Sequence, residues 1–303
     1  LFFNCIRISN NFESKQQVTN LEDFIQGMTV KCFYEDWKGN VWIGYYDDYI
    51  TCYDPVTDKY EDIVLPKGES RDVLPLRTVN CFLQDTDSTL WIGTELGLTQ
   101  YNLYTKSFKT MVQSHKLIHP NEKITALCRD SYGWLWAGTN CGGLRCYDSN
   151  GNLRSIYTAR EGSVGTLRSN DVTCLYEDVE GTLWVGTMEG LCYFNREEEL
   201  FVTVQRKGVE HDDAIMGICE DNYNRLWISS SIGLLSYNYR QNRFYLYDTD
   251  DGIQPGEFNR GIFAKADDGE LLFGGINAVN RLYPNSLVNE GVSAKVLIED
   301  FQI

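Results

Sequence analysis

Three histidines, ten cysteines and a regular series of aspartates are the residues best suited to acid–base, redox or metal chemistry. His115 and His119 share one segment, whereas His211 lies in the acidic run 210–213. No His-Glu-x-x-His or similar ligand spacing accompanies them, and no nucleophile elbow or phosphate loop is present in the sequence. We therefore expect solvated loop histidines, no catalytic residue, no metal site and no cofactor.

The cysteines follow a repeated spacing rather than a disulfide framework. Cys32, Cys81 and Cys174 each stand four residues before an aspartate of the series. Small residues that recur on one face of a strand suit a crowded core, where a thiol acts as a small hydrophobe. We expect buried thiols; the alternative is a disulfide between the neighbours Cys141 and Cys146.

A further set of aromatic, amide, carboxylate and guanidinium side chains stands in segments that vary between the repeats described below. Rings can stack on the apolar face of a sugar, and planar polar groups can form in-plane hydrogen bonds with its hydroxyls. These residue types predict an oligosaccharide-binding face, unless each is an ordinary loop residue. The candidate binding residues are Tyr45, Tyr46, Asp47, Arg77, Asn140, Arg168, Asn170, Glu189, Asn259 and Arg260.

An internal repeat positions these residues. Its anchors, spaced by 43 to 49 residues, are Trp42, Trp91, Trp136, Trp184, Trp227 and Leu272. An aspartate stands six residues before each Trp, and the last copy has Ala266 at that place. A glycine stands two residues after the anchor in every copy except the fifth, which has Ser229.

Each repeat contains four short segments with the β-rich composition of strands. The Asp-x-x-Gly step, as in Asp178 to Gly181, predicts a hairpin turn between the first two segments. Four strands in every ~45 residues are typical of propeller blades. We predict an all-β fold, a β-propeller of four-stranded antiparallel blades with six recognisable repeats, in a parent ring of seven. An aspartate present in nearly every blade is then a folding device and not a catalyst.

Composition narrows the classes of function. The chain has 303 residues and a formal net charge of −16, which disfavours binding to nucleic acid or to an anionic membrane. No apolar run approaches the ~20 residues needed to span a bilayer. We expect a folded binding module without nucleic-acid contacts.

The repeat unit, cleanest in 178–191 and 90–98, resembles the two-component regulator propeller repeat. The last copy, with 251–259, 269–277 and Leu272 in place of Trp, is similar to the closing blade of such sensors' periplasmic regions. The tail 294–303 resembles the first strand of the Ig-like triple-tyrosine domain that follows those propellers.

The resemblance implies a periplasmic fragment of a hybrid two-component histidine kinase of gut Bacteroidetes. Such sensors detect glycan-derived oligosaccharides and regulate polysaccharide utilisation. The implied divisions are 1–27 (outer strands of an incomplete preceding blade), 28–287 (propeller) and 288–303 (linker and first Ig-like strand). The implied partners are an oligosaccharide, a preceding propeller, the Ig-like domain and a second copy in a homodimer. The alternatives are a streptogramin-lyase-like propeller lyase or hydrolase, and a non-catalytic dimerisation scaffold.

Overall fold

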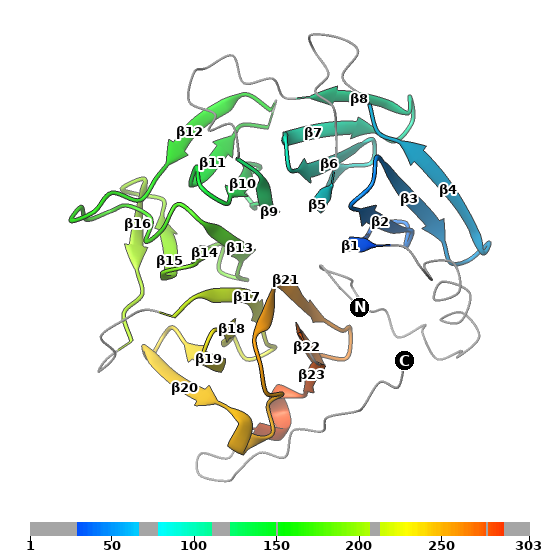
Figure 1. The fold of residues 1–303 in the computed structure, drawn as a ribbon. Helices are drawn as coiled ribbons and strands as arrows, with labels where there is room; N and C mark the ends of the chain where they lie inside the picture. Colours follow the sequence, from blue (N-terminus) through cyan, green and yellow to red (C-terminus); the bar gives the residue numbers. More distant parts are fainter. Residues whose placement is uncertain are drawn as a thin grey trace.

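Six antiparallel sheets are arranged around a common centre in the computed structural model of the chain (Figure 1). The structure describes residues 29–66, 78–110, 122–149, 151–206, 213–276 and 278–287. The predicted segments 1–27 and 288–303 lie outside these residues. Within the described part, no helix is long and apolar enough to cross a membrane.

The first three sheets are four-stranded meanders. The first contains β1 (Val30–Glu35), β2 (Val41–Tyr45), β3 (Tyr49–Asp54) and β4 (Lys59–Val64). The second contains β5 (Val79–Thr86), β6 (Thr89–Thr94), β7 (Gly97–Asn102) and β8 (Ser107–Thr110). The third contains β9 (Ile124–Arg129), β10 (Leu135–Thr139), β11 (Leu144–Tyr147) and β12 (Leu153–Tyr157).

The next three sheets continue the pattern, with three strands described in the last. The fourth contains β13 (Val172–Glu177), β14 (Leu183–Thr187), β15 (Gly190–Asn195) and β16 (Leu200–Thr203). The fifth contains β17 (Ile215–Glu220), β18 (Leu226–Ser230), β19 (Gly233–Asn238) and β20 (Arg243–Tyr247). The sixth contains β21 (Phe258–Lys265), β22 (Leu271–Gly275) and β23 (Val279–Leu282), flanked by the 3₁₀ turns η1 (Thr249–Asp251) and η2 (Pro284–Leu287).

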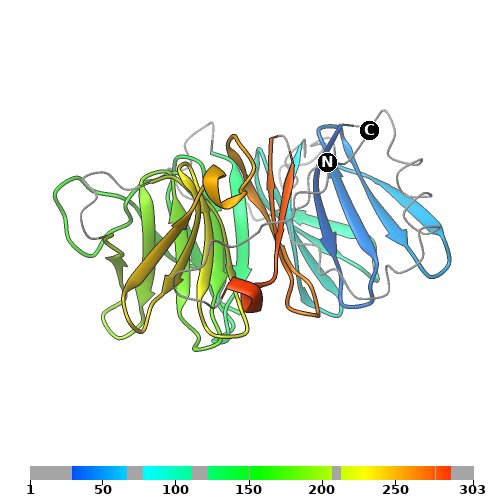
Figure 2. The ribbon, with the colours of Figure 1, turned by 90° about the horizontal axis from the view of Figure 1, so that it is seen from below.

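The first strand of each sheet lies nearest the centre, and the innermost strands of consecutive sheets pack against one another from β1 to β21. Seen from the side, the sheets stand side by side and form a flat disc (Figure 2). The predicted all-β propeller with six repeats is confirmed. A seven-membered parent ring stays a prediction.

The aspartate and tryptophan of each repeat are hydrogen-bond partners. In five blades the Trp indole nitrogen donates to the carboxylate six residues earlier, at distances of 2.7 to 3.0 Å. In the first blade the Asp36 carboxylate also accepts from the backbone nitrogens of Lys38 and Asn40, each at 2.9 Å. The aspartate therefore shapes the hairpin turn and satisfies a buried indole donor, which explains its six-residue spacing from the Trp.

The sixth blade has lost both partners together. Leu272 has no N–H that needs an acceptor, and Ala266 offers no side-chain acceptor. Ala266 keeps the turn through its backbone, since its carbonyl accepts from Gly269 at 3.0 Å. The paired loss follows from the hydrogen bond, because either partner alone would leave a buried polar group unsatisfied.

The repeated glycine makes room for the repeated cysteine. Cys174 faces Gly186 across the β13–β14 pair, and a Cβ on Gly186 would lie 2.5 Å from the Cys174 sulfur. The first two blades show the same crowding at Gly44 and Gly93. In the fifth blade the small and larger positions are exchanged, with glycine on β17 opposite serine on β18. The repeated glycine therefore allows a thiol of the same blade and a side chain of the next blade to approach closely.

The cysteines of the described part are thiols and are not joined by disulfides. Five of them are buried, and Cys141 and Cys146 do not pair, which excludes the alternative disulfide. Burial raises the pKa of the Cys52 and Cys146 thiols to about 12. Such thiols are poor nucleophiles and suit a structural role.

Candidate functional site

One face of the disc is built by a hydrogen bond that all six blades repeat. The residue just after the second strand donates its backbone N–H to the carbonyl of a residue just before the innermost strand. The donor–acceptor pairs, at 3.0 to 3.3 Å, are Tyr46–Thr29, Glu95–Thr78, Asn140–Lys123, Met188–Asp171, Ser231–Ala214 and Ile276–Glu257. We call the face formed by these two sets of loops the entry face.

Arg260 and Asp171 join the sixth and fourth blades on this face. The guanidinium of Arg260, on the innermost strand β21, binds the Asp171 carboxylate at the start of the fourth blade through two contacts of 2.9 Å. The side chains stay 42% and 26% exposed, so the pair is worth little to stability. It does hold a planar cation and a carboxylate where a ligand from solvent can reach them.

Three further predicted residues lie beside this pair. Asn170 precedes Asp171, and its side chain accepts from the backbone of Ala159 at 2.7 Å. Arg168 donates to the carbonyl of Glu189 at 3.3 Å. Arg168, Asn170, Glu189 and Arg260 therefore gather on the entry face near the fourth blade.

Asn140 continues the set on the third blade. Its side-chain oxygen accepts from the Lys123 backbone at 2.8 Å, and the Lys123 ammonium bonds to Glu95 at 2.6 Å. A larger residue in place of Gly142 would displace the Glu122 side chain, because a Cβ there would lie 2.2 Å from a carboxylate oxygen of Glu122. Glu122 is itself paired with Arg145 in a contact almost wholly withdrawn from solvent. The Asn140 loop is thus fixed before any ligand arrives.

The two predicted tyrosines of the first blade differ in their exposure to solvent. Tyr46 is exposed, and its hydroxyl accepts from the Lys31 ammonium at 3.2 Å. Asp47 is exposed in the same turn. Tyr45 is fully buried, and its hydroxyl lies 3.2 Å from that of Thr51. Tyr45 is therefore unavailable to a ligand and is removed from the candidate set.

Two predicted binding residues remain, Asn259 and Arg77. Asn259 is partly buried in β21, next to Arg260. Arg77 lies outside the described residues, as do the three histidines. Within the described ranges, no group of three or more His, Cys, Asp or Glu side chains is arranged to hold a metal ion.

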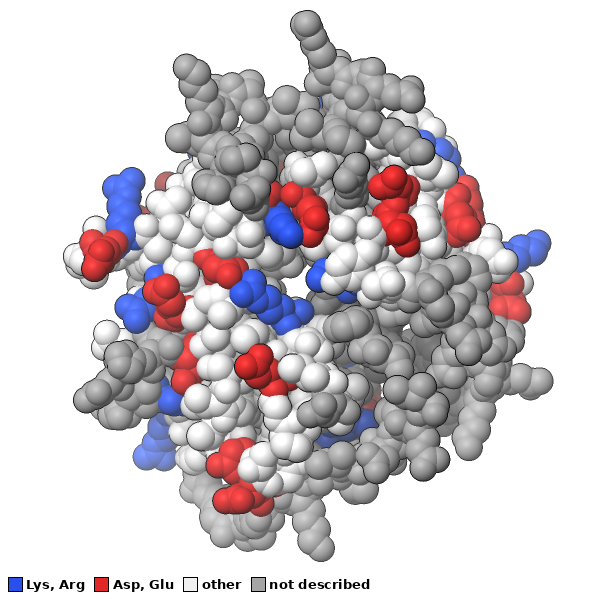
Figure 3. All heavy atoms as spheres, in the orientation of Figure 1, with Lys and Arg blue, Asp and Glu red and all other residues white. Residues whose placement is uncertain are grey.

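Several charged residues of the entry face were missed at the sequence level. Asp171, Lys123 and Glu95 belong to the two loop positions that the repeated hydrogen bond defines. The repeat alignment already contained this signal, because each stands at a fixed distance from its anchor Trp. Viewed along the disc axis, basic and acidic side chains intermingle around the centre (Figure 3). Paired charges of both signs and planar amides suit a polar, uncharged ligand better than a polyanion.

The fold is a β-propeller, and comparison with known proteins finds a family model that matches three stretches of the chain. Residues 74–95, 119–141 and 166–189 match the family model described as two component regulator propeller. These three stretches therefore match the two-component regulator propeller repeat that the sequence motifs resemble.

The chain is similar to the extracellular domain of a putative hybrid two-component system from B. thetaiotaomicron. The two share 29% identity with a TM-score of 0.72, over 86% of this chain and 34% of that one. Histidine kinase P4 of Formosa agariphila is 26% identical over 211 residues, which are 68% of this chain and 15% of the kinase. The chain thus spans a minor part of both relatives.

Virginiamycin B lyase from Staphylococcus aureus shares the fold, with a TM-score of 0.66 over 91% of this chain and 85% of the lyase. Its sequence identity is 14%, so the likeness concerns the fold alone.

Proposed function

We propose that this chain is a periplasmic sensing module of a hybrid two-component histidine kinase and binds glycan-derived oligosaccharides without catalysing a reaction. The observation that carries the proposal is the similarity to the extracellular domain of a hybrid two-component system over 86% of the chain. Its expected output is regulation of polysaccharide utilisation. Its expected neighbours are a preceding propeller, a following Ig-like domain and a second copy of the parent protein.

The entry face supports an oligosaccharide as ligand. Asn140, Arg168, Asn170, Glu189 and Arg260 offer amide, guanidinium and carboxylate groups on one surface. Each group forms hydrogen bonds in its own plane, which matches the hydroxyls around a sugar ring. The repeated hydrogen bond holds the backbone of Asn140 and joins Asp171 to Met188, the neighbours of Asn170 and Glu189, so little ordering of these loops would accompany binding.

A thermal-shift screen tests the proposal. The complete 303-residue chain is melted with neutral and acidic tetra- to octasaccharides, and at least one is expected to raise its melting temperature. Arg260→Ala should reduce that shift. Arg154→Ala is a matched control, because both side chains are 42% exposed and paired with a carboxylate, and Arg154 lies on the outer strand β12.

The outcome separates the alternatives. No shift with any oligosaccharide, together with a concentration-dependent dimer in sedimentation, would replace the sensor proposal with a dimerisation scaffold. Chemical conversion of an added oligosaccharide would contradict the non-catalytic assignment.

A further inference from the structure

A cavity of about 400 Å³ opens to solvent between the fourth and fifth sheets, away from the entry-face candidates. Its volume lies within the range of small-molecule sites, about 300–1,000 Å³. We call it the lateral pocket. Its lining residues are Glu180, Thr182, Trp184, Tyr193, Val202, Thr203, Val204, Gln205, Tyr237, Tyr239 and Asn242. A second cavity, near Arg206 and Asp213, has about 30 Å³ and holds no more than a water molecule.

Aromatic rings form the wall of the lateral pocket. The Trp184 ring centre lies 5.4 Å from that of Tyr193 and 5.8 Å from that of Tyr239. Tyr237 meets Trp184 edge-on at 6.0 Å and stacks on Phe244 at 4.0 Å. The rings support one another, so the wall keeps its shape without a ligand.

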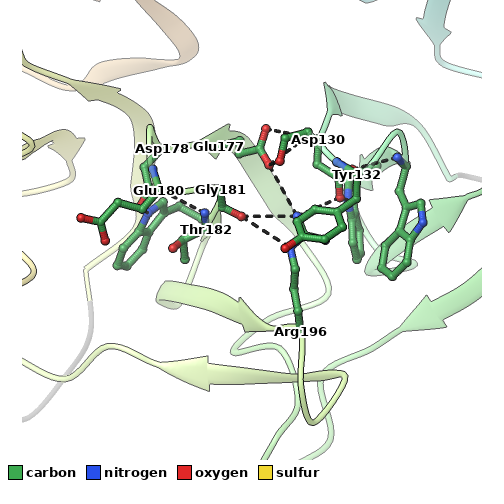
Figure 4. A network of polar contacts seen from close by, with 12 residues as sticks. Asp130, Tyr132, Glu177, Asp178, Glu180, Gly181, Thr182 and Arg196 are labelled. Atoms are coloured by element: carbon green, nitrogen blue, oxygen red, sulfur yellow. Dashed lines mark hydrogen bonds and ion pairs between the residues drawn. The ribbon is translucent and has the colours of Figure 1, made fainter.

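Side chains fill the equivalent space at the junction between the third and fourth sheets. There Trp136 meets Phe194 edge-on at 5.0 Å, as Trp184 meets Tyr237, but the Tyr157 ring packs in at 5.9 Å from Trp136. Arg196 closes the remaining space, with its guanidinium 4.0 Å from the Tyr132 ring centre and 3.0 Å from the Asp130 carboxylate (Figure 4).

Three substitutions within the repeat distinguish the open junction. Val204, which bonds to Leu191, occupies the register of Tyr157, which pairs with Leu144. Tyr239 occupies the register of Arg196, and its hydroxyl donates to Glu220 at 3.3 Å. Tyr193 pairs with the anchor Trp across the strands, in a register where Cys146 stands in the third blade and Ser236 in the fifth. An extra ring at Tyr193 and the loss of the Tyr157 ring and of the guanidinium replace a closed network with an aromatic-walled cavity.

The rim of the pocket is polar and its surroundings are acidic. Glu180 and Asn242 are exposed at the hairpin turns on either side, and Arg240 forms an ion pair with Glu180. Burial, and then the carboxylates of Glu220, Asp178 and Glu180, raises the pKa of Tyr239, so its phenol stays protonated at neutral pH. Amide and carboxylate groups beside aromatic rings fit a hydroxylated ring, and the local negative charge disfavours an anionic one.

We propose that the lateral pocket binds one or two neutral sugar rings, with an apolar sugar face stacked on the exposed side of Tyr193. The inference rests on the proposed function, since it takes the ligand to be a glycan. It assigns short, neutral saccharides to the lateral pocket, at the junction of the fourth and fifth blades.

Isothermal titration calorimetry of the complete chain with maltose, cellobiose and xylobiose, and with digalacturonic acid, tests the proposal. At least one neutral disaccharide should bind, and digalacturonic acid should not. Tyr193→Ser, which introduces the residue type found at this register in the fifth blade, should weaken binding about tenfold or more. Tyr239→Arg, which introduces the residue type of Arg196, should abolish it by filling the cavity. Tyr245→Ser is the control, because that tyrosine is exposed on the outer strand β20.

Each other result overturns a stated part of the inference. Disaccharide binding that survives both pocket variants would place the sugar elsewhere and leave the proposed function standing. If longer oligosaccharides raise the melting temperature but no disaccharide binds, the lateral pocket is not the disaccharide site and the proposed function still stands. Preference for digalacturonic acid would refute the neutral class, and failure of every saccharide would refute both proposals. Tyr193→Ser alone decides the location if Tyr239→Arg does not fold.

Discussion

The bond between the repeated aspartate and tryptophan can be measured with a double-mutant cycle at Asp36 and Trp42. Asp36→Ala leaves the Trp42 indole, in a side chain 2% exposed, without its acceptor at 2.9 Å. It also releases the backbone N–H groups of Lys38 and Asn40, which can turn to water. The buried indole N–H left without an acceptor costs about 1–3 kcal/mol and the loss of the turn contacts adds a similar amount, so we expect a total loss of about 2–6 kcal/mol.

The second variant removes the need for the acceptor. Trp42→Leu loses ring contacts with Phe82 and Tyr101 and should cost about 2–4 kcal/mol. With leucine present, Asp36→Ala no longer strands an indole donor. The double variant should therefore be more stable than additivity predicts by about 1–3 kcal/mol.

Urea unfolding followed by far-UV circular dichroism measures the four free energies, and the remaining tryptophans test whether unfolding is two-state. Asp36→Ala combined with Trp227→Leu, in another blade, is the control and should be additive. A coupling energy for Asp36 and Trp42 below about 0.5 kcal/mol would refute the reasoning, because distant sites show as much.

Three further outcomes follow from the core and its charges. Gly186→Ser should cost about 1–3 kcal/mol in urea unfolding through its clashes with Cys174 and with Ile215 of the next blade, and adding Cys174→Gly should recover the part that Cys174 causes; no recovery would contradict the pairing of Gly186 with Cys174. Since burial raises the pKa of Cys52 and Cys146 to about 12, iodoacetamide at pH ~8 should alkylate them at least a hundredfold more slowly in the native than in the unfolded chain, as mass spectrometry would show. Burial is the largest cause that raises the pKa of Glu220, so the stability it contributes is present below its unfolded pKa and lost as pH rises through its folded pKa. Glu220→Gln should therefore lose less unfolding free energy than the native chain between about pH 4 and pH 7, and an equal loss would count against this.

The entry face shows where residue types alone mislead. Tyr45 and Tyr46 are adjacent and chemically identical, yet Tyr45 ends β2, which is buried on both faces, and Tyr46 stands in the exposed turn that follows. Thr94 and Thr139 occupy the position of Tyr45 in the aligned repeats, three residues after the anchor Trp, and both are also buried. Arg168 and Asn170 could be assigned to this face from the sequence because they stand in loops that vary between the aligned repeats, and their role in binding stays a prediction.

The repeat by itself determined the fold, the order of the strands and the structural role of the aspartates and cysteines, because each blade forms from contacts local in sequence. Only the tertiary structure decided which blades' side chains meet. Arg260 reaches Asp171, 89 residues away in the chain, because the ring brings the innermost strand of the sixth blade near that of the fourth. The lateral pocket likewise exists because Tyr193 and Tyr239 come from neighbouring blades whose side chains leave space between them. The spacing of the repeated residues along the chain determines the structure of a blade. The packing of one blade against the next determines which side chains come together in a site.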